Sequence, residues 1–298
     1  MLNRFRCLRE RGWQEIDAGT YTAAWHAHGG SVVTHPDVVA RLSALAGLPV
    51  RYLGWVREGR VDAALAAWGR HLALSREALK QLGRKRLFDL GNAEVILPAA
   101  PDVHAPLRHS VRYLSELQSR QFSGIRRQRE ELMLARPPEE FSRKFRYNQR
   151  REWRLLQEAN AVARPVHDYA AGELAHIYGG LFAKRWGFAA PGLERLPEVF
   201  ALLREFMVGA VLEQNGAPIA MQVLYRAVSP RWISVEYVNG GVDPDVRDFS
   251  PGSVLSYLNI EAAWAEARSG EKELRYSFGR GDRDYKDRWC HPVAVYWR

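Results

Sequence analysis

The sequence predicts a mixed α/β fold of the α+β kind, with two domains in tandem that each hold a twisted mixed sheet flanked by helices. The chain has 298 residues, which is enough for about two domains. Its second half predicts the element order β-α-α-β-β-β-α-β-α-β, and its first half repeats this order loosely. The prolines of Arg136-Pro137-Pro138 end the preceding element, so we expect domains over 1–138 and 139–298.

In the second half, apolar spacing and turn signals place each element. A hairpin is expected at Asn215-Gly216, because this dipeptide favours the tight turns that join antiparallel strands. Ser250 and Pro251 begin a helix that connects two strands, so those strands should be parallel. The expected helices are 141–159, 174–186, 196–207, 251–268 and 284–289, and the expected strands are 161–166, 208–214, 217–226, 232–238, 273–278 and 293–297.

The first half shows weaker signals of the same kind. Strands are expected near 13–17, 50–56 and 61–68, and helices near 21–27, 36–46 and 107–119. The pattern over 70–86 is ambiguous, so the conformation of this segment is left open.

The composition excludes several classes of protein. Hydrophobic residues make up 47% and charged residues 26%, as in a folded soluble protein. Cys7 and Cys290 lie at opposite ends, which excludes a disulfide framework and favours a reducing compartment. No segment is apolar enough to span a membrane, and arginines stand where a signal peptide needs an apolar core. We therefore expect a cytoplasmic protein.

The net charge of +9 and the pI near 9.7 point to anionic partners. Residues 1–154 carry a net charge of +11 and the remainder carries −2, so the excess lies in the first half and the basic helix. The histidines are scattered and no Cys, Asp or Glu cluster completes a metal site, so no metal is expected. No DNA-reading motif is evident, and DNA is not an expected partner.

The segment 276–289 is the first candidate for binding chemistry. Gly279 and Gly281 flank Arg280 just past a strand, at the sheet edge where open α/β sheets bind ligands. Arg280 could contact a phosphate or carboxylate through both arms of its guanidinium, and Lys286 could add a point charge. The alternative is a charged turn whose arginines and aspartates pair with one another.

The start of the helix at 251–268 is the second candidate. Free N–H groups at a helix N-terminus bind phosphate, and Gly252 permits close approach of the backbone. Ser250, Gly252 and Ser253 are therefore candidate cofactor-binding residues. An ordinary helix cap is an equally good explanation of the same residues.

Glu236 is the third candidate, because a carboxylate in the apolar strand 232–238 is costly unless it is paired or protonated. Burial would raise its pKa toward the range of a general base. A structural ion pair explains the residue equally well.

The fourth candidate is the helix at 141–159, where Arg143, Arg146, Arg150 and Arg154 form a stripe. A solvated helix face is the common explanation. The functional alternative is a surface for RNA backbone, cofactor phosphates or an anionic membrane.

Several motifs together resemble a known family. The runs Phe249-Ser-Pro-Gly252 and Ser277-Phe-Gly-Arg-Gly-Asp-Arg-Asp-Tyr-Lys-Asp-Arg-Trp289 are similar to the C-terminal signature of FemAB-like acyltransferases of the GNAT superfamily. The wider pattern resembles the macrophage-inducible-gene-fourteen family of Gram-negative bacteria. It includes His35-Pro36, Asp89-Leu-Gly-Asn-Ala-Glu94, Ala135-Arg-Pro-Pro-Glu139, Lys144-Phe-Arg-Tyr-Asn-Gln-Arg-Arg151 and 232–244.

This resemblance implies two GNAT-like domains, the first of them degenerate, and a link to virulence through resistance to cationic antimicrobial peptides. It implies association with the inner membrane, so a peripheral location there is expected beside the cytoplasmic one. It also implies an acyl-CoA or aminoacyl-tRNA donor and an amine acceptor. In peptidoglycan-bridge aminoacyltransferases a lysine in a Phe-Lys-x-x-Phe motif lies near the donor, and Tyr285-Lys286 with Trp289 stands in that place here.

The expected activity is N-acyl transfer. The donor should lie between strands 232–238 and 273–278, with Glu236, or failing that Asp282, as the base and backbone N–H groups of 236–238 as an oxyanion site. The alternative is a catalytically inactive GNAT-like protein that binds a membrane or a cationic peptide.

Overall fold

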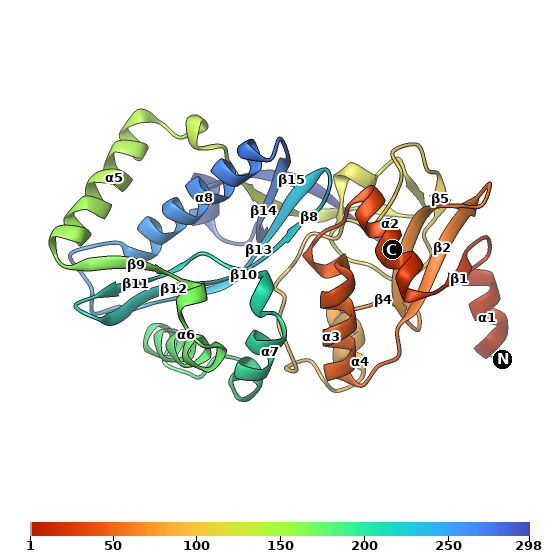
Figure 1. Ribbon diagram of the computed structural model, residues 1–298, viewed down its shortest axis with the longest axis horizontal. Coiled ribbons are helices and arrows are strands. Elements are labelled where there is room, and N and C mark those ends of the chain that lie inside the picture. The colour runs from red at the N-terminus through yellow and green to blue at the C-terminus, as the bar shows by residue number, and fades with distance from the viewer. Residues whose placement is uncertain (1) are drawn as a thin grey trace.

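The computed structural model describes residues 2–298 and the side chains of residues 6–298 (Figure 1). The helices are α1 Leu2–Arg9, α2 Ala18–His28, α3 Pro36–Ala46, α4 Arg76–Gln81, α5 Arg143–Glu158, α6 Ala171–Trp186, α7 Leu196–Leu202 and α8 Pro251–Ser269. The 3₁₀ turns that bear on the site are η1 Val32–Thr34, η2 Glu116–Gln118, η3 Pro138–Glu140 and η7 Asp284–Arg288.

The strands of the first half are β1 Gln14–Ile16, β2 Arg51–Arg57, β3 Arg60–Trp68, β4 His71–Leu72, β5 Ala105–Pro106, β6 Leu114–Ser115, β7 Phe122–Ser123 and β8 Arg126–Ala135. Those of the second half are β9 Ala161–Pro165, β10 Met207–Val208, β11 Ala210–Gln214, β12 Ala217–Val228, β13 Trp232–Val242, β14 Glu273–Arg280 and β15 Cys290–Trp297.

A nine-stranded mixed sheet dominates the molecule. Its order is β6-β15-β8-β14-β13-β12-β11-β9, with β10 beside β12. The predicted hairpin is confirmed, since Asn215 and Gly216 both have positive φ, at 52° and 78°. β13 and β14 pair in parallel, as the helix between them predicts. The first half adds a four-stranded sheet in the order β1-β2-β3-β4.

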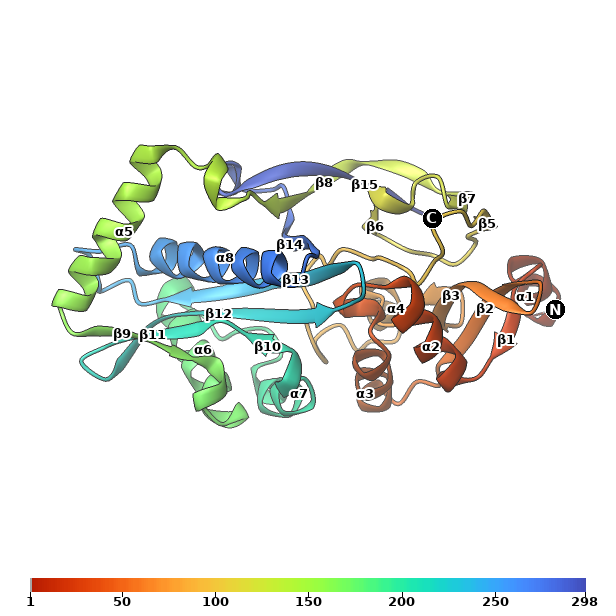
Figure 2. The same cartoon turned by 45° about the horizontal axis from the view of Figure 1, so that its top comes forward.

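Different elements pack on the two faces of the large sheet (Figure 2). Ile233 and Val235 of β13 pack in the core cluster that holds Tyr257 and Ile260 of α8. The alternate residue Ser234 faces the first half, where its Oγ accepts a hydrogen bond from the Val32 N–H at 3.2 Å. α6 and α7 cover the rest of that second face, as Figure 2 shows. The period of two along β13 thus places the first half directly on the sheet.

The junction between the halves is continuous. β8 precedes the expected boundary at residue 138, yet it pairs with both β14 and β15. One hydrophobic core joins Trp25 and Leu42 of the first half to Tyr178 and Phe200 of the second. A division at residue 138 would cut both features, so the two-domain organisation stays a prediction.

Three expectations need correction. No helix forms over 107–119: this segment is largely irregular, with the short strand β6 and the turn η2. Its apolar residues are buried by long-range pairing, such as the Val95 N–H donating to the Tyr113 carbonyl at 2.9 Å, and not along one helix face. Strand 232–238 continues to Val242, and helix 196–207 ends at Leu202. The open segment 70–86 contains β4 and α4.

Candidate functional site

The parallel strands β13 and β14 part halfway along their length. They pair from Trp232 and Glu273 to Glu236 and Ser277. Beyond that point β13 stays with β12, whereas β14 pairs with β8 at Ser277 and Arg280. An irregularity in the β12–β13 register leaves Val238 as an extra residue on β13. The facing edges of 238–242 and 278–280 are therefore not paired with each other, which opens the sheet at the carboxyl ends of the two strands.

The loop at 89–94 covers this opening on the side of the first half. Gly91 has a φ of 69°, and a Cβ added there would lie 3.3 Å from the Val238 Cα. Gly279 has a φ of 72° and faces Asn92 across an ordinary van der Waals distance. Glycine at position 91 thus combines a left-handed backbone with close approach to β13.

Aromatic side chains close the other side. The rings of Tyr237 and Phe278 meet edge to face at 5.0 Å, one from each of the parting strands. Trp289, which follows η7, packs edge to face on Phe141 and Phe145 near the start of α5. Burial raises the pKa of Tyr237, so this phenol stays neutral.

A cavity of about 620 Å³ lies among residues of the first half, beside the loop at 89–94. Gly91, Asn92 and Arg280 lie in its wall, so the cavity reaches the loop at 89–94 and the end of β14. Its volume is within the range of small-molecule sites. The apolar part of the lining includes Tyr21, Val39, Leu74, Leu79 and Phe88, and the cationic part is Arg76, Lys80, Lys85, Arg86, Arg112 and Arg280.

The cations of the cavity fall into two groups. Arg112 and Arg280 each contact Glu130 at 3.0 Å, so that carboxylate partly neutralises them. Arg76, Lys80, Lys85 and Arg86 are exposed and form no ion pair within residues 6–298. Glu77 and Asp89 are the acidic side chains in the lining, so the cavity has an excess of positive charge.

Arg280, Asp282 and Lys286 are brought together, as the sequence predicts, but they bind one another. Asp282 accepts from Arg280 at 3.0 Å and from Lys286 at 3.1 Å, and the Lys286 ammonium also donates to the Arg280 carbonyl at 2.6 Å. Burial alone would raise the pKa of Asp282, but the hydrogen bonds from Lys286 and Arg280 outweigh it and hold that pKa below its ordinary value. Asp282 is thus ionised and only weakly basic.

Glu236 lies behind the loop at 89–94 and does not line the cavity. Its side chain is buried, and its Oε1 accepts a hydrogen bond from the Glu94 backbone N–H at 3.0 Å. Burial raises the pKa of Glu236 well above its ordinary value, and the nearby carboxylate of Glu94 raises it further. The surroundings fit a protonated structural carboxyl, and a catalytic role for it stays a prediction.

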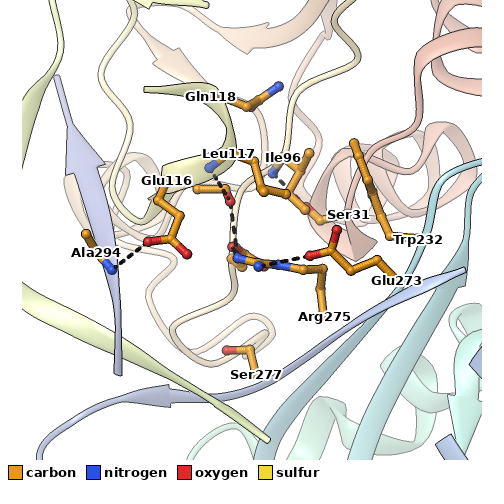
Figure 3. Close-up of polar contacts among 12 residues, drawn as sticks. Ser31, Ile96, Glu116, Leu117, Gln118, Trp232, Glu273, Arg275, Ser277 and Ala294 are labelled. Carbon is orange, nitrogen blue, oxygen red and sulfur yellow. Dashed lines mark hydrogen bonds and ion pairs between the residues drawn. The ribbon is translucent and has the colours of Figure 1, made fainter. Parts of the chain in front are cut away.

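A buried ion pair stands beside Glu236. Arg275 of β14 donates through Nε to Glu94 at 3.1 Å and also contacts Glu273 at 3.3 Å and Ser115 at 3.4 Å. Figure 3 shows this guanidinium between the two halves, with Ser277 and Glu116 among the neighbouring polar side chains. The sequence analysis did not single out Glu94 or Arg275 as partners, because 181 positions separate them along the chain.

The N-terminus of α8 carries a different set of contacts. The Ser250 N–H donates to the Glu152 carboxylate of α5, and the Ser253 N–H donates to the Ser250 carbonyl at 2.9 Å. A Cβ at Gly252 would lie 2.8 Å from Val242, so close packing on β13 also requires glycine there. A carboxylate thus occupies part of the place expected for a phosphate, and no contact joins Ser250–Ser253 to Arg280 or Lys286.

Two further candidates lie on the surface. Tyr285 is about half exposed, at 48%. The arginine stripe follows α5, with Arg143, Arg150 and Arg154 exposed. Within residues 6–298 no group of three or more His, Cys, Asp or Glu side chains is placed to hold a metal ion. No helix of the described chain has the length and apolar character needed to cross a bilayer.

The sequence analysis missed the cavity and all of its cations except Arg280. Lys80, Lys85 and Arg86 stand in the segment 70–86, whose conformation the sequence leaves open, and the cavity forms only when this segment meets η1 and β14. The sequence feature that could have pointed to the cavity is Gly91 in Asp89-Leu-Gly-Asn-Ala-Glu94, a loop glycine followed by an acidic residue, Glu94, that is buried in the structure. Local spacing does not show which distant strand such a loop covers.

Solved structures share the mixed α/β fold. FemX matches with a TM-score of 0.53 and 11% identity, covering 91% of this chain and 90% of FemX. A conserved protein of unknown function from Bacteroides thetaiotaomicron VPI-5482 gives a TM-score of 0.53 and 12% identity, covering 96% of this chain and 98% of that one. L-PGS from Bacillus licheniformis gives 0.47 and 12%, covering 95% and 92%. At these identities the match to FemX defines the fold class and nothing finer.

The sequence itself gives the family. The Mig-14 family model matches residues 35–297. The chain therefore belongs to the Mig-14 family, which confirms the resemblance that its motifs indicate. A comparison with curated proteins found no match.

Proposed function

We propose that the protein is a transferase that moves an acyl or aminoacyl group from a thioester or ester donor to an amine. The observation that carries the proposal is the parting of β13 and β14 beside a cavity of about 620 Å³, which reaches Arg280 at the end of β14. The donor carbonyl lies between the parting strands, and the acceptor reaches it through the cavity.

The chemistry needs little from side chains. Backbone N–H groups on the unpaired edges of 238–242 and 278–280 stabilise the oxyanion of the tetrahedral intermediate. The amine attacks the carbonyl carbon, and the thiolate or alkoxide of the donor leaves. The positive charge around the cavity lowers the pKa of a bound ammonium group, which favours the neutral nucleophile.

The sequence-based roles are retained as hypotheses within this proposal. Glu236, once it has lost its own proton, or the ionised Asp282 takes the amine proton, and Lys286 with Tyr285 lies near the donor, as the FemAB-like resemblance implies. Donor phosphates bind the amides of Gly252 and Ser253 once the Glu152 carboxylate moves aside. The donor is acyl-CoA or aminoacyl-tRNA, and the activity contributes to resistance to cationic antimicrobial peptides at the inner membrane.

A second function has its own support. The loop at 89–94 covers the opening and Glu152 occupies the start of α8, which fits a catalytically inactive protein that binds a membrane or a peptide. A cationic peptide is a poor ligand for the cavity, because Arg76, Lys80, Lys85 and Arg86 would repel it. A membrane is therefore the better partner under this alternative.

Isothermal titration with acetyl-CoA, a long-chain acyl-CoA and charged tRNA tests the proposal. We expect one donor to bind, and Lys85→Glu/Arg86→Glu to slow its turnover with an amine while Arg11→Glu/Arg60→Glu, an exposed pair outside the cavity, leaves turnover unchanged. Binding of none of these donors, with peptide resistance intact in Glu236→Gln and Lys286→Ala cells, would favour the inactive protein.

A further inference from the structure

The outward face of α5 is a second concentration of positive charge, apart from the cavity. Five arginines and one tyrosine follow it over three turns: Arg143, Arg146, Tyr147, Arg150, Arg151 and Arg154. Arg154 pairs with Glu158 at 3.6 Å, and the other four arginines form no ion pair among the side chains of residues 6–298. The face therefore lacks the carboxylates that neutralise an ordinary charged helix surface.

The geometry of this face suits a chain of phosphates. Side chains three or four positions apart on a helix stand about 5–6 Å apart, so successive arginines form a row along the helix axis. Arginine contacts phosphate through two parallel hydrogen bonds, which lysine does not provide. From Arg143 to Arg154 the row spans roughly 16 Å at the rise of an α-helix, which is longer than a single diphosphate group.

The same helix is poorly suited to insertion into a membrane. An interfacial helix turns its apolar face toward the lipid. Here the apolar side chains of α5 face the protein: Leu156 is buried in the core with Trp153, and Phe145 packs on Trp289. The outward face offers one large ring, Tyr147, which is 65% exposed in the middle of the arginine row. An exposed ring among arginines is the combination that stacks on an unpaired base.

We propose that the arginine face of α5 binds the phosphodiester backbone of an RNA, with Tyr147 stacking on an unpaired base. This surface would hold the donor of the proposed transfer reaction. The inference rests on the proposed function in one respect, that the bound RNA carries the group to be transferred. Glu152 of the same helix contacts Ser250, the N-cap residue of α8, from the side of α5 opposite the arginine row. α5 therefore stands between the bound RNA and the start of α8.

Fluorescence anisotropy with deacylated bulk tRNA as the probe tests the surface without requiring group transfer. Reversal of three charges, Arg143→Glu/Arg146→Glu/Arg150→Glu, should weaken binding at least about tenfold and reduce the slope of log K against log salt by about two to three. Tyr147→Ala should weaken binding about tenfold with little change in that slope. The matched control Arg11→Glu/Arg60→Glu/Arg120→Glu carries the same charge change on other exposed residues and should bind within about twofold of the wild type.

Three outcomes would overturn the proposal. These are absence of tRNA binding, equal loss in the α5 variant and the control, and loss of binding to phosphatidylglycerol vesicles in the α5 variant with tRNA binding unchanged. The melting temperature of each variant confirms that it folds. Because the probe is deacylated, a protein that binds tRNA through α5 but transfers no group would contradict the proposed function and leave this inference standing.

Discussion

At the scale of single residues, the structure gives the surroundings of Glu236, a carboxyl for which the sequence left a catalytic and a structural explanation open. Glu236 could be predicted as an unusual carboxyl, because it stands in an apolar strand. Its neighbours could not, since Glu94 and Arg275 reach it from a distant loop and the adjacent strand. Glu236 is a buried acid at the junction of the two halves. Burial makes its ionised form costly, and this cost determines its effect on stability.

Glu236 should make the stability of the protein depend on pH. Its folded pKa lies well above the ordinary value of 4.5, so above pH 4.5 the unfolded chain binds fewer protons than the folded one. The free energy of unfolding should then fall as pH rises from about 4.5 toward the folded pKa, by up to about 1.4 kcal/mol per pH unit. Glu236→Gln keeps the shape and removes this slope, which urea unfolding at pH 5 and pH 8 measures. If the free energy of unfolding depends on pH equally in the wild type and the variant, Glu236 does not have a raised pKa in the folded protein.

Gly91 should be the more sensitive of two glycines with similar backbone. Gly59 has a φ of 78° and open space where a Cβ would stand, whereas a Cβ at Gly91 would lie 3.3 Å from the Val238 backbone. Gly59→Ala should cost about 1 kcal/mol from its φ alone, and Gly91→Ala should cost more, about 2–3 kcal/mol in total. Chemical denaturation of both variants gives the comparison. An equal loss of unfolding free energy at the two positions would mean that the loop at 89–94 does not pack closely against β13.

At the scale of elements, the strongest local signals predicted the correct structure. Asn215-Gly216 specifies a hairpin, and Ser250-Pro251 specifies the start of α8, because turn and cap residues act locally. β8 was missed, since six of its ten residues are charged or polar and it is held by β14 and β15. The prediction of a helix at 107–119 was wrong for a related reason. The apolar residues of this segment are buried against segments that are distant in the sequence.

The start of α8 offers a test at this scale. Glu152 places a carboxylate where the amides and the helix dipole favour an anion. If donor phosphates bind there, Glu152→Gln should strengthen acyl-CoA binding by about threefold to tenfold, because the competing charge is removed. Titration calorimetry of the variant measures this, with Glu158→Gln, further along the same helix, as the control. Unchanged or weaker binding in Glu152→Gln would assign Ser250, Gly252 and Ser253 to helix capping.

At the scale of the whole molecule, positive charge gathers in two places, the cavity and the outward face of α5. The cavity cations other than Arg280 precede β8 in the sequence, and the arginine row of α5 follows it. The net charge predicted an anionic partner, and the arginine spacing predicted the stripe on α5. The cavity was not predicted, because folding decides which cations keep a carboxylate. The nine-stranded sheet contains strands from both halves of the chain. Residues from both halves therefore surround the opening between β13 and β14.

The central claim is that an acyl donor lies between β13 and β14. Hydrogen–deuterium exchange of the full chain, with and without the donor that binds most tightly in calorimetry, tests it most directly. The account predicts slower exchange in 237–242, 276–281 and 88–94 when the donor is bound. Saturating donor that leaves these three segments unchanged, and protects only residues elsewhere, would contradict it.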